Sequence, residues 1–383
     1  MTARLAVTAP AKINLWLRVF GRDAKGYHAI ESLFQLISIA DELVVERTPS
    51  GVTLAGAPEA LGPVDENLIV RAARGFLRAA GASGGVAIVL SKRIPWNAGL
   101  GGASSDAAAT LLAMNRLHAN RLTPGDLIEL GASLGSDVPF FLTGAPLALG
   151  WGRGERLLGL PPLPALPLLI VPPPAPVKTA EAYAWLDKDR AAEHTGEFAA
   201  VVPVNALGSW EEVRRRSHND FEPVVAGRLP QIGHWLDRLR ATDAFLVRLA
   251  GSGGAMVALY ETAPARDAAW RRLGADERML RGETLTAASG VRESGHDVEV
   301  TLDDGLATAT HTLRFTSTAR SPTEVRYRVA VPHGAWLAGL EVCDAGGCRM
   351  GEVLGDAGAA AYDDAVRARP LVGARELLPV GHA

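Results

Sequence analysis

The sequence contains little cysteine and no long apolar stretch. Its 383 residues include two cysteines, Cys343 and Cys348, which are too few for a disulfide framework or a four-cysteine zinc site. We therefore expect reduced thiols and no metal site built from the chain's own residues. No stretch of about eighteen uncharged apolar residues occurs, and the first residues lack the pattern of a signal peptide. These absences predict a cytoplasmic protein with no membrane partner.

Long runs of one charge are also missing. The 39 basic and 42 acidic residues give a formal net charge of -3, and the short run Arg214 to Arg216 is typical of a solvated helix face. This balance argues against nucleic acid as a partner. Hydrophobic residues make up 48% and charged residues 21% of the chain, which is typical of globular proteins and excludes a disordered or fibrous chain.

The length predicts two or three domains. Strand-like and helical segments alternate up to a proline-rich stretch near Leu160, and a second set of helical and strand-like segments follows up to about Ala288. We expect an α+β protein with domains at 1–160 and 161–288 and a β-rich extension at 289–383. The expected strands are Leu15–Phe20, Leu43–Glu46, Val86–Leu90 and Leu168–Val171, and the expected helices are Leu68–Ala80, Ser105–His118, Pro124–Leu134, Ala180–Leu186, Asp220–Ala226 and Ile232–Ala241.

The most informative segment is PWNAGLGGASSDAA, which joins a predicted strand to a predicted helix. Its glycines, Gly99, Gly101 and Gly102, allow the backbone to adopt positive φ and to approach a ligand closely. Ser104 or Ser105 is predicted to cap the helix, whose free N-terminal amides attract phosphate. The loop lacks the Gly-Lys-Ser/Thr of a Walker motif and the spacing of a dinucleotide-binding fingerprint. The alternative is a tight turn that only caps a helix.

Two charged residues stand where predicted strands or helices begin or end. Lys12 lies near a proline at the start of a strand, and Asp137 lies between a helix end and Pro139. Alone, such residues are usually a solvated lysine and a turn aspartate. Phosphoryl transfer to an alcohol needs a carboxylate that accepts the hydroxyl proton and a cation that neutralises charge on the phosphate. Lys12 and Asp137 are the candidates for these roles.

Together these segments resemble the GHMP kinases over residues 1–288. Within that superfamily, APAKINLWLRVFGRDAKGYHAIESLFQ and LGSDVPFF resemble the diphosphocytidyl-methylerythritol kinases. The resemblance implies a two-lobed fold, with an N-terminal lobe like ribosomal protein S5 domain 2 and a ferredoxin-like C-terminal lobe. It also implies ATP and Mg²⁺ as cofactors. The residues implied for ATP binding are Asn67, Pro95, Asn97, Ala98, Gly99, Leu100, Gly101, Gly102, Ala103, Ser104 and Ser105.

The resemblance also implies the small-molecule substrate, a cytidyl-diphospho sugar alcohol whose 2-hydroxyl is phosphorylated. Asp137 is then the catalytic base and Lys12 the stabilising cation. The subfamily-specific turn is GYH at residues 26–28, because an aromatic ring beside an imidazole suits a pyrimidine base. The residues implied for substrate binding are Asn14, Tyr27, His28, Phe34, Gly251 and Gly253.

Two departures from the subfamily pattern keep other functions open. Asn97 and Ala103 stand where this subfamily usually has glycine, and a methyl group at Ala103 would crowd the loop or require a negative φ. One alternative is a GHMP kinase for another small alcohol, such as homoserine or mevalonate. Another is a catalytically impaired binding protein that works through the extension, which weakly resembles the adhesive module of vault and inter-α-trypsin proteins. We expect a monomer or a homodimer.

Overall fold

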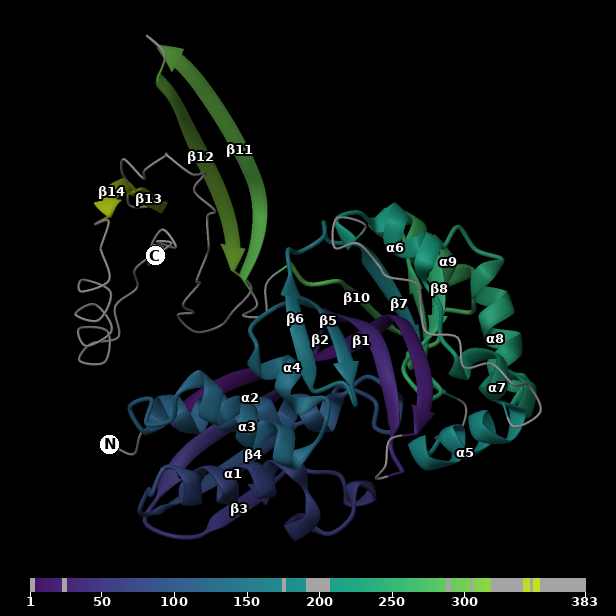
Figure 1. Cartoon of the computed structure of the whole chain (residues 1–383), viewed down its shortest axis with the longest axis horizontal. Coiled ribbons are helices and arrows are strands. Elements are labelled where there is room, and N and C mark those ends of the chain that lie inside the picture. The colour runs from purple at the N-terminus through teal and green to yellow at the C-terminus, as the bar shows by residue number, and fades with distance from the viewer. Residues whose placement is uncertain are drawn as a thin grey trace. The chain divides into compact units, whose positions relative to one another are not determined.

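The computed structural model divides the chain into two compact units, residues 1–288 and 289–383 (Figure 1). The described part of the second unit contains two antiparallel strand pairs, β11 (Val291–Asp303) with β12 (Leu306–Ser317) and β13 (Leu340–Asp344) with β14 (Gly347–Gly351). The residues that the structure describes are 4–22, 26–173, 177–190, 207–286, 291–303, 306–317, 340–344 and 347–351.

Among the described residues, the first sheet of unit 1 has six strands, β1 (Arg4–Arg22), β2 (His28–Thr48), β3 (Val52–Ala55), β4 (Gly85–Ser91), β5 (Leu147–Gly152) and β6 (Arg156–Leu160). Their order is β3-β4-β2-β5-β6, with β1 also paired to β2. The register of β1 on β2 shifts between Pro10 and Lys12, and such an irregularity bends a strand and redirects its side chains. The first candidate catalytic residue therefore lies at an interruption of regular pairing.

Four helices lie together on one side of this sheet (Figure 1), α1 (Leu68–Ala79), α2 (Gly102–Leu117), α3 (Pro124–Leu134) and α4 (Val138–Leu142). The long helix α2 packs between the sheet and its neighbours. Its apolar residues Ala107, Leu111 and Met114 recur at helical spacing and are fully buried. This packing fixes the N-terminal end of α2, which follows the glycine-rich loop directly.

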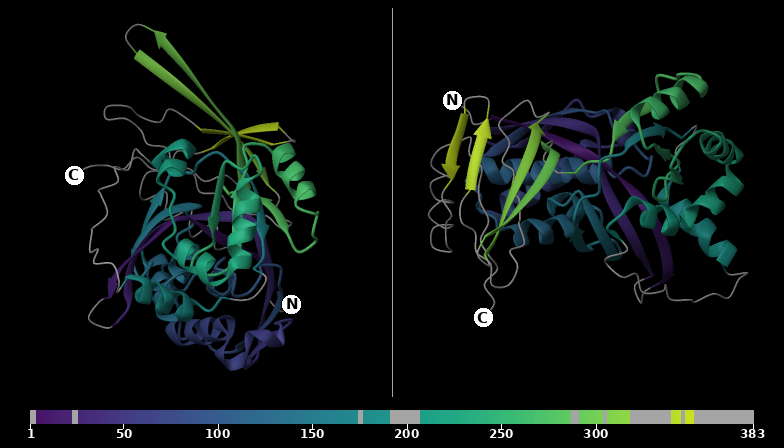
Figure 2. Two further views of the ribbon diagram at one scale, coloured as in Figure 1. Left: turned by 90° about the vertical axis from the view of Figure 1, so that its right-hand side faces the viewer. Right: turned by 90° about the horizontal axis from the view of Figure 1, so that it is seen from above.

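A second sheet, ordered β10-β7-β9-β8, lies in the same unit with helices α5 to α9 around it (Figure 2). Segments that flank this sheet bind to the first sheet through backbone hydrogen bonds, since Leu17 N–H in β1 donates to the His218 carbonyl at 2.7 Å and Leu285 N–H, just after β10, donates to the Leu36 carbonyl at 2.8 Å. The elements are β7 (Pro167–Val171), α5 (Thr179–Arg190), α6 (Trp210–Arg216), α7 (Phe221–Arg228), α8 (Pro230–Arg240), β8 (Leu246–Leu249), β9 (Met256–Leu259), α9 (Ala263–Arg272) and β10 (Leu280–Glu283).

Each expected strand and helix of residues 1–288 overlaps one in the structure, but β1 and β2 are much longer than expected and begin at Arg4 and His28 rather than at Leu15 and Leu43. The α+β, two-lobed fold is therefore confirmed. In the extension, which was expected to be β-rich, the described residues form the strands β11 to β14, and the other residues of 289–383 lie outside the described part of the chain. In the part of the chain that the structure describes, no helix is long and apolar enough to cross a membrane.

Asn219 links the second sheet to the start of helix α7. Its Nδ2 donates to the carbonyl oxygens of Leu249 at 2.9 Å and Gly251 at 2.8 Å, while its Oδ1 accepts from Phe221 N–H at 2.9 Å. The side chain is 3% exposed. Water therefore cannot replace these partners, and Asn219 holds the glycine turn after β8 in place.

We expect Asn219→Ala to lower the free energy of unfolding by about 3 kcal/mol, because it leaves buried backbone groups without partners. Urea denaturation followed by circular dichroism measures this loss. The neighbouring His218 side chain is 53% exposed and pairs with Asp220 at 2.6 Å, so His218→Ala serves as the control and should cost no more than about 1 kcal/mol. Equal losses in the two variants would contradict this role for Asn219.

Candidate active site

The glycine-rich loop lies against two other segments that leave no room for side chains. Gly99 has a φ of +81°, and a Cβ atom there would collide with the carbonyl oxygen of Ala250. Gly101 has a φ of +70°, and a Cβ atom there would lie 3.0 Å from Lys12 Cγ and from the Phe141 ring. The loop is thus fixed between β1 and the turn that follows β8.

The N-terminus of α2 is capped without a serine side chain. The cap residue is Gly101, and Ser105 Oγ donates instead to the Pro10 carbonyl oxygen at 2.7 Å, which ties the helix to β1. The predicted capping role of Ser104 or Ser105 is therefore wrong, because the helix begins before both of them. The first amides of α2 have no side-chain cap, and such amides attract phosphate together with the helix dipole.

Asn97 and Ala103 fit this backbone. Asn97 has a φ of +52°, a left-handed conformation that asparagine adopts more readily than most non-glycine residues. Ala103 is an exposed residue in the first turn of α2, where φ is negative. Of the two outcomes expected for its methyl group, the structure shows the negative φ. Alanine therefore requires no strained backbone at this position.

Lys12 and Asp137 meet beside the loop. Lys12 N–H donates to the Leu100 carbonyl oxygen at 3.0 Å, and Lys12 Nζ lies 3.6 Å from Asp137 Oδ2. The buried ammonium also donates to Asn14 Oδ1 at 2.7 Å and lies 5.6 Å from the centre of the Phe34 ring. The Asp137 side chain remains 30% exposed. An enclosed cation beside a partly open carboxylate can stabilise negative charge and accept a proton.

The predicted substrate-binding residues Asn14, Gly251 and Gly253 lie next to this pair and the loop. Asn14 Nδ2 donates to Ser32 Oγ at 2.7 Å, which fixes the orientation of its carboxamide. A Cβ atom on Gly251 would lie 3.4 Å from Asn14 Oδ1, and one on Gly253 would collide with the backbone nitrogen of Gly99. The structure thus brings these residues together, and their contact with substrate stays a prediction.

Asn67 lies at the N-terminus of α1 and has a structural partner there. Its Oδ1 accepts a hydrogen bond from Ile69 N–H at 3.0 Å, so the side chain caps the helix. The predicted contact of Asn67 with adenine stays a prediction. Because an amide side chain has both an acceptor and two donors, the capping bond leaves the Asn67 Nδ2 group available to a ligand.

A buried ion cluster that the sequence did not predict lies beside the loop. Lys92 Nζ lies 2.5 Å from Asp41 Oδ2 and 2.9 Å from Asp106 Oδ2, and all three side chains are buried. A Cβ atom on Gly102 would lie 2.9 Å from Lys92 Nζ, so this charge is next to the first residue of α2. Burial raises the pKa of Asp106 to about 7, although Lys92 opposes the shift.

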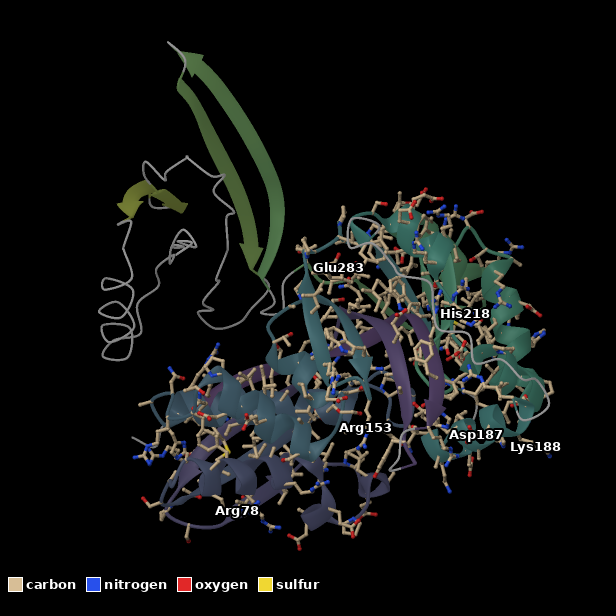
Figure 3. The ribbon with its side chains drawn as sticks, in the orientation of Figure 1. Arg78, Arg153, Asp187, Lys188, His218 and Glu283 are labelled. Carbon is tan, nitrogen blue, oxygen red and sulfur yellow. The ribbon has the colours of Figure 1, made fainter. Side chains whose placement is uncertain are left out.

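Helix α5 holds the predicted base-binding turn. His28 Nδ1 is 2.7 Å from the Phe20 carbonyl oxygen and Nε2 is 2.9 Å from Asp187 Oδ1, while Arg22 pairs with the same carboxylate. Figure 3 labels Asp187. Burial would raise the pKa of Asp187, but hydrogen bonds from Arg22 and His28 outweigh it and hold the pKa below its usual value. Tyr183 stacks on the His28 ring with centroids 5.1 Å apart. Two side chains of α5 therefore fix His28.

One side chain near this turn, that of Arg153, escaped the sequence analysis of the site. Tyr27 is 57% exposed, and the Arg153 guanidinium lies 3.9 Å from its ring centroid. Burial, together with the charge of Asp137, raises the pKa of Tyr183 to about 12. The charge of Asp137 therefore lies close enough to Tyr183 to affect its ionisation. Nothing in the sequence placed Arg153 near the GYH turn, because Tyr27 is far from it along the chain.

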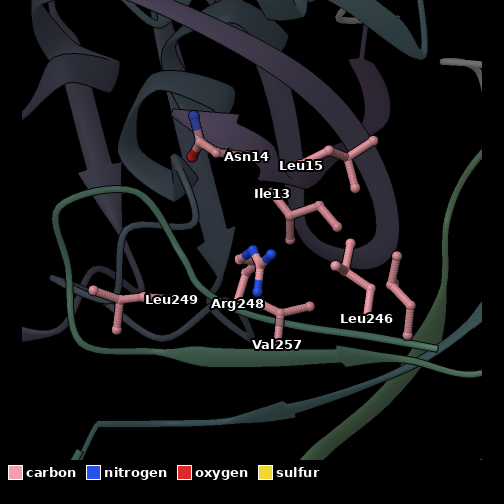
Figure 4. Close-up of a pocket in the computed structure, with 8 residues that line it drawn as sticks. Ile13, Asn14, Leu15, Leu246, Arg248, Leu249 and Val257 are labelled. Carbon is pink, nitrogen blue, oxygen red and sulfur yellow. The ribbon is translucent and has the colours of Figure 1, made fainter. Parts of the chain in front are cut away.

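A small cavity lies between β1 and the β8–β9 pair (Figure 4). Its volume is about 10 Å³, which is close to the space of a single water molecule. It therefore cannot hold a substrate and is a packing defect beside the site. The residues that line it are Ile13, Asn14, Leu15, Leu246, Arg248, Leu249, Val257 and Leu259.

Two family models match the chain. The model of the GHMP kinases N terminal domain matches residues 67–145, and that of the GHMP kinases C terminal matches residues 201–277. The first match includes the glycine-rich loop, α2 and Asp137. The second includes Asn219 and the glycine turn that contacts the loop. The glycine-rich loop, Asp137 and the glycine turn therefore lie in segments typical of this family, whereas Lys12 and the GYH turn precede the first match.

Curated relatives and solved structures point the same way. A protein of Solibacter usitatus named 4-diphosphocytidyl-2-C-methyl-D-erythritol kinase is 40% identical over 281 residues, which are 72% of this chain and 87% of that protein. Its namesake in Deinococcus radiodurans is 40% identical over 265 residues, covering 68% of this chain and 86% of that protein.

Among solved structures, a crystal structure of 4-(cytidine 5'-diphospho)-2C-methyl-D-erythritol kinase superposes with a TM-score of 0.62 at 38% identity, covering 73% of this chain and 99% of that one. Homoserine kinase from Cytophaga hutchinsonii superposes with a TM-score of 0.55 at 19% identity, covering 75% of this chain and 96% of that one. At that low identity the likeness to homoserine kinase concerns the fold alone.

We expect Gly99→Ala to weaken ATP binding about 100-fold, because the new methyl group meets backbone and the positive φ strains alanine. Isothermal titration calorimetry measures the dissociation constant. The control is Ala103→Gly, which changes the same loop by one methyl group at a helical φ and should leave the constant within about twofold of the parent. A large gain in affinity in Ala103→Gly would show that this methyl group obstructs the nucleotide.

The raised pKa of Asp106 predicts a pH dependence of stability. The Asp106 carboxyl has a pKa near 4 in the unfolded chain and about 7 in the folded protein, so between these pH values the folded state binds a proton that the unfolded state does not. The free energy of unfolding therefore falls as the pH rises through this range. The stability of the parent relative to Asp106→Asn should thus fall by about 2 to 3 kcal/mol from pH 5 to pH 8. Urea denaturation at both pH values measures the difference.

Asp126 provides a control of opposite sign. Hydrogen bonds from Thr123 lower the pKa of this exposed carboxylate, so its stabilisation is lost as the pH falls through that pKa. The stability of the parent relative to Asp126→Asn should therefore not decline from pH 5 to pH 8. A difference between parent and Asp106→Asn that does not change with pH would contradict the raised pKa.

Proposed function

The chain belongs to the 4-diphosphocytidyl-2-C-methyl-D-erythritol kinases of the GHMP kinase family, and we propose that it phosphorylates the 2-hydroxyl of 4-diphosphocytidyl-2-C-methyl-D-erythritol with ATP in isopentenyl diphosphate biosynthesis. Relatives of that name match at 40% identity over most of their length. The structural observation that carries the proposal is the 3.6 Å pair of Lys12 and Asp137 beside the glycine-rich loop. A phosphotransferase with an alcohol acceptor uses a carboxylate to accept the hydroxyl proton and a cation to neutralise charge on the transferred phosphoryl group.

In the proposed mechanism Asp137 accepts the proton of the acceptor hydroxyl as its oxygen attacks the γ-phosphorus of ATP. The bond to the leaving ADP oxygen breaks, and the phosphoryl group stays on the acceptor. Lys12 neutralises the negative charge that develops on the transferred group, a contribution of about 3 kcal/mol for comparable groups. Asn14 holds Lys12 Nζ at 2.7 Å, so the ammonium is oriented before substrate binds.

The loop and α2 fit a bound nucleotide. Gly99 and Gly101 let the loop pack closely against Ala250 and Lys12, and the first amides of α2 are free of side-chain caps and so can bind phosphate. Bound ATP with Mg²⁺ supplies the phosphoryl group. Among the described residues no three or more His, Cys, Asp or Glu converge on a metal site, and Mg²⁺ in kinases is commonly held largely by the phosphates. The proposed nucleotide contacts are those of residues 95, 97–105 and 67.

The acceptor is proposed to place its base at the GYH turn and its hydroxyl at Asp137. Tyr27 offers an exposed ring, and the His28 ring is held by Asp187 and by the Phe20 carbonyl oxygen. A ring and an imidazole of this kind suit a pyrimidine, whereas homoserine or mevalonate has no use for them. The impaired-kinase alternative loses support, because the backbone at Asn97 and Ala103 is unstrained for these residues.

The wider organisation is part of the same proposal. We assign the nucleotide-binding lobe to residues 1–160 and the second lobe to 161–288, since the first sheet ends at Leu160 and the second begins with β7. Residues 289–383 form an extension with no assigned role. The protein is proposed to act on its small-molecule substrate in the cytoplasm, as a monomer or homodimer.

The experiment that tests this function measures ADP release with ATP, Mg²⁺ and each of three acceptors, the cytidyl alcohol, homoserine and mevalonate. We expect turnover with the cytidyl alcohol alone. Asp137→Asn should lower kcat at least about 100-fold, because it removes the proton acceptor. The exposed Asp243→Asn is the control and should leave kcat unchanged. Turnover with another alcohol would reassign the substrate, and no turnover with any would favour a binding protein.

A further inference from the structure

A pocket lined by arginines lies where β10 and α9 meet β2 and the segment that follows β4. Its volume is about 480 Å³, which is within the range of sites for small molecules. Of the six residues that line it, three are arginines and none is acidic. The lining residues are Ile39, Arg93, Arg266, Met279, Leu280 and Arg281.

The carboxylate of Asp267 holds two of these arginines in place. Arg266 Nε and Nη2 each lie 2.9 Å from Asp267 Oδ1, and Arg281 Nη1 donates to the same oxygen at 3.2 Å. Burial would raise the pKa of Asp267, but hydrogen bonds and charge from Arg266 and Arg281 outweigh it and lower that pKa. The carboxylate is therefore ionised at neutral pH and positions both guanidiniums before a ligand arrives.

Both arginines can bind a ligand without giving up their present partners. Arg266 Nη1 also donates to the Gly282 carbonyl oxygen at 3.2 Å, and the Arg281 guanidinium lies 4.3 Å from the centroid of the Trp270 ring. A guanidinium carries five N–H donors, so these contacts use only part of what each arginine offers. The Arg281 side chain is 43% exposed, so its remaining donors are accessible from solvent.

The third arginine, Arg93, lies in the segment that leads from β4 into the glycine-rich loop. Its backbone N–H donates to Asp41 Oδ1 at 2.5 Å, and Ile94 N–H donates to the same oxygen at 2.8 Å. Asp41 is fully buried, so this part of the backbone is firmly held. The Arg93 side chain is exposed at the pocket. Positive charge from three separate segments therefore meets at one place.

The charge and the size of the pocket indicate its ligand. Arginine suits phosphate, because its planar guanidinium can bind two phosphate oxygens at once. Guanidiniums gathered at one pocket repel one another, and a ligand with several negative charges relieves that repulsion. Ile39 and Met279 are buried, so one side of the pocket is apolar and screens this attraction less than open solvent does. A single phosphate is small for this volume, which favours linked phosphates.

We propose that this pocket binds a small anion with two or more linked phosphate groups, through Arg93, Arg266 and Arg281. The site is separate from the proposed catalytic centre, since none of its lining residues is among those proposed to contact ATP or the acceptor. The inference does not rest on the proposed function, because binding at this pocket requires no turnover.

The test titrates the full chain with inorganic pyrophosphate and with inorganic phosphate by isothermal titration calorimetry. A non-hydrolysable ATP analogue is kept in excess, so that the glycine-rich loop is occupied. We expect pyrophosphate to bind at least about tenfold more tightly than phosphate. Arg93→Gln and Arg281→Gln should each weaken pyrophosphate binding at least about tenfold, and Arg281→Lys should weaken it less, because lysine keeps the charge but not the paired donors.

Arg278 provides the matched control, since its side chain is 79% exposed, pairs with Asp276 and does not line the pocket. Arg278→Gln removes the same charge and should leave pyrophosphate binding within about twofold of the parent. Equal weakening in Arg278→Gln and Arg281→Gln would show a general effect of charge and overturn the inference. Absence of pyrophosphate binding, or equal binding of phosphate, would overturn it as well. ADP release tests the proposed function separately, so either proposal can fail alone.

Discussion

The site depends on a backbone contact so close that side chains are excluded from it. Gly99 in the glycine-rich loop meets the carbonyl of Ala250, and Gly253 meets the nitrogen of Gly99. These contacts join the loop of the first sheet to the turn of the second. Because backbone atoms resist displacement more than flexible side chains do, the position of the loop is set by hard sterics. Because the Lys12 side chain packs against Gly101, its position is fixed together with that of the loop.

Two buried lysines serve the loop in different ways. Lys12 faces a carboxylate that is partly open to solvent, so the pair can react with a ligand that enters from outside. Lys92 is enclosed by two carboxylates that solvent barely reaches, so its charge remains next to the first residue of α2 without access to a reacting group. Lys12 can therefore interact with a reacting group, whereas Lys92 contributes a fixed positive charge beside α2.

Much of this arrangement could be predicted from the sequence, because helical spacing, turn residues and motif resemblance are local signals. They predicted α2 and the loop, and they led to Lys12 and Asp137 as candidate catalytic residues, which the structure places 3.6 Å apart. They failed where the answer depends on residues remote in the sequence. The cap of α2 was misplaced because Gly101 takes a left-handed φ that lets the helix begin before the serines. The partners of Lys92 and the neighbours of Arg153 belong to other segments of the chain. The spacing of residues in the sequence cannot predict such long-range contacts.

Helix α5, which lies beside the second sheet, contacts the first sheet through His28. Its Tyr183 and Asp187 fix His28, which lies at the start of β2 in the other sheet. A ligand bound at that turn would therefore touch segments from both sheets at once and act as a reversible cross-link between them. By mass action, free energy of binding then adds to the free energy that keeps the sheets docked. The apparent stability of the folded protein would therefore rise with the concentration of such a ligand.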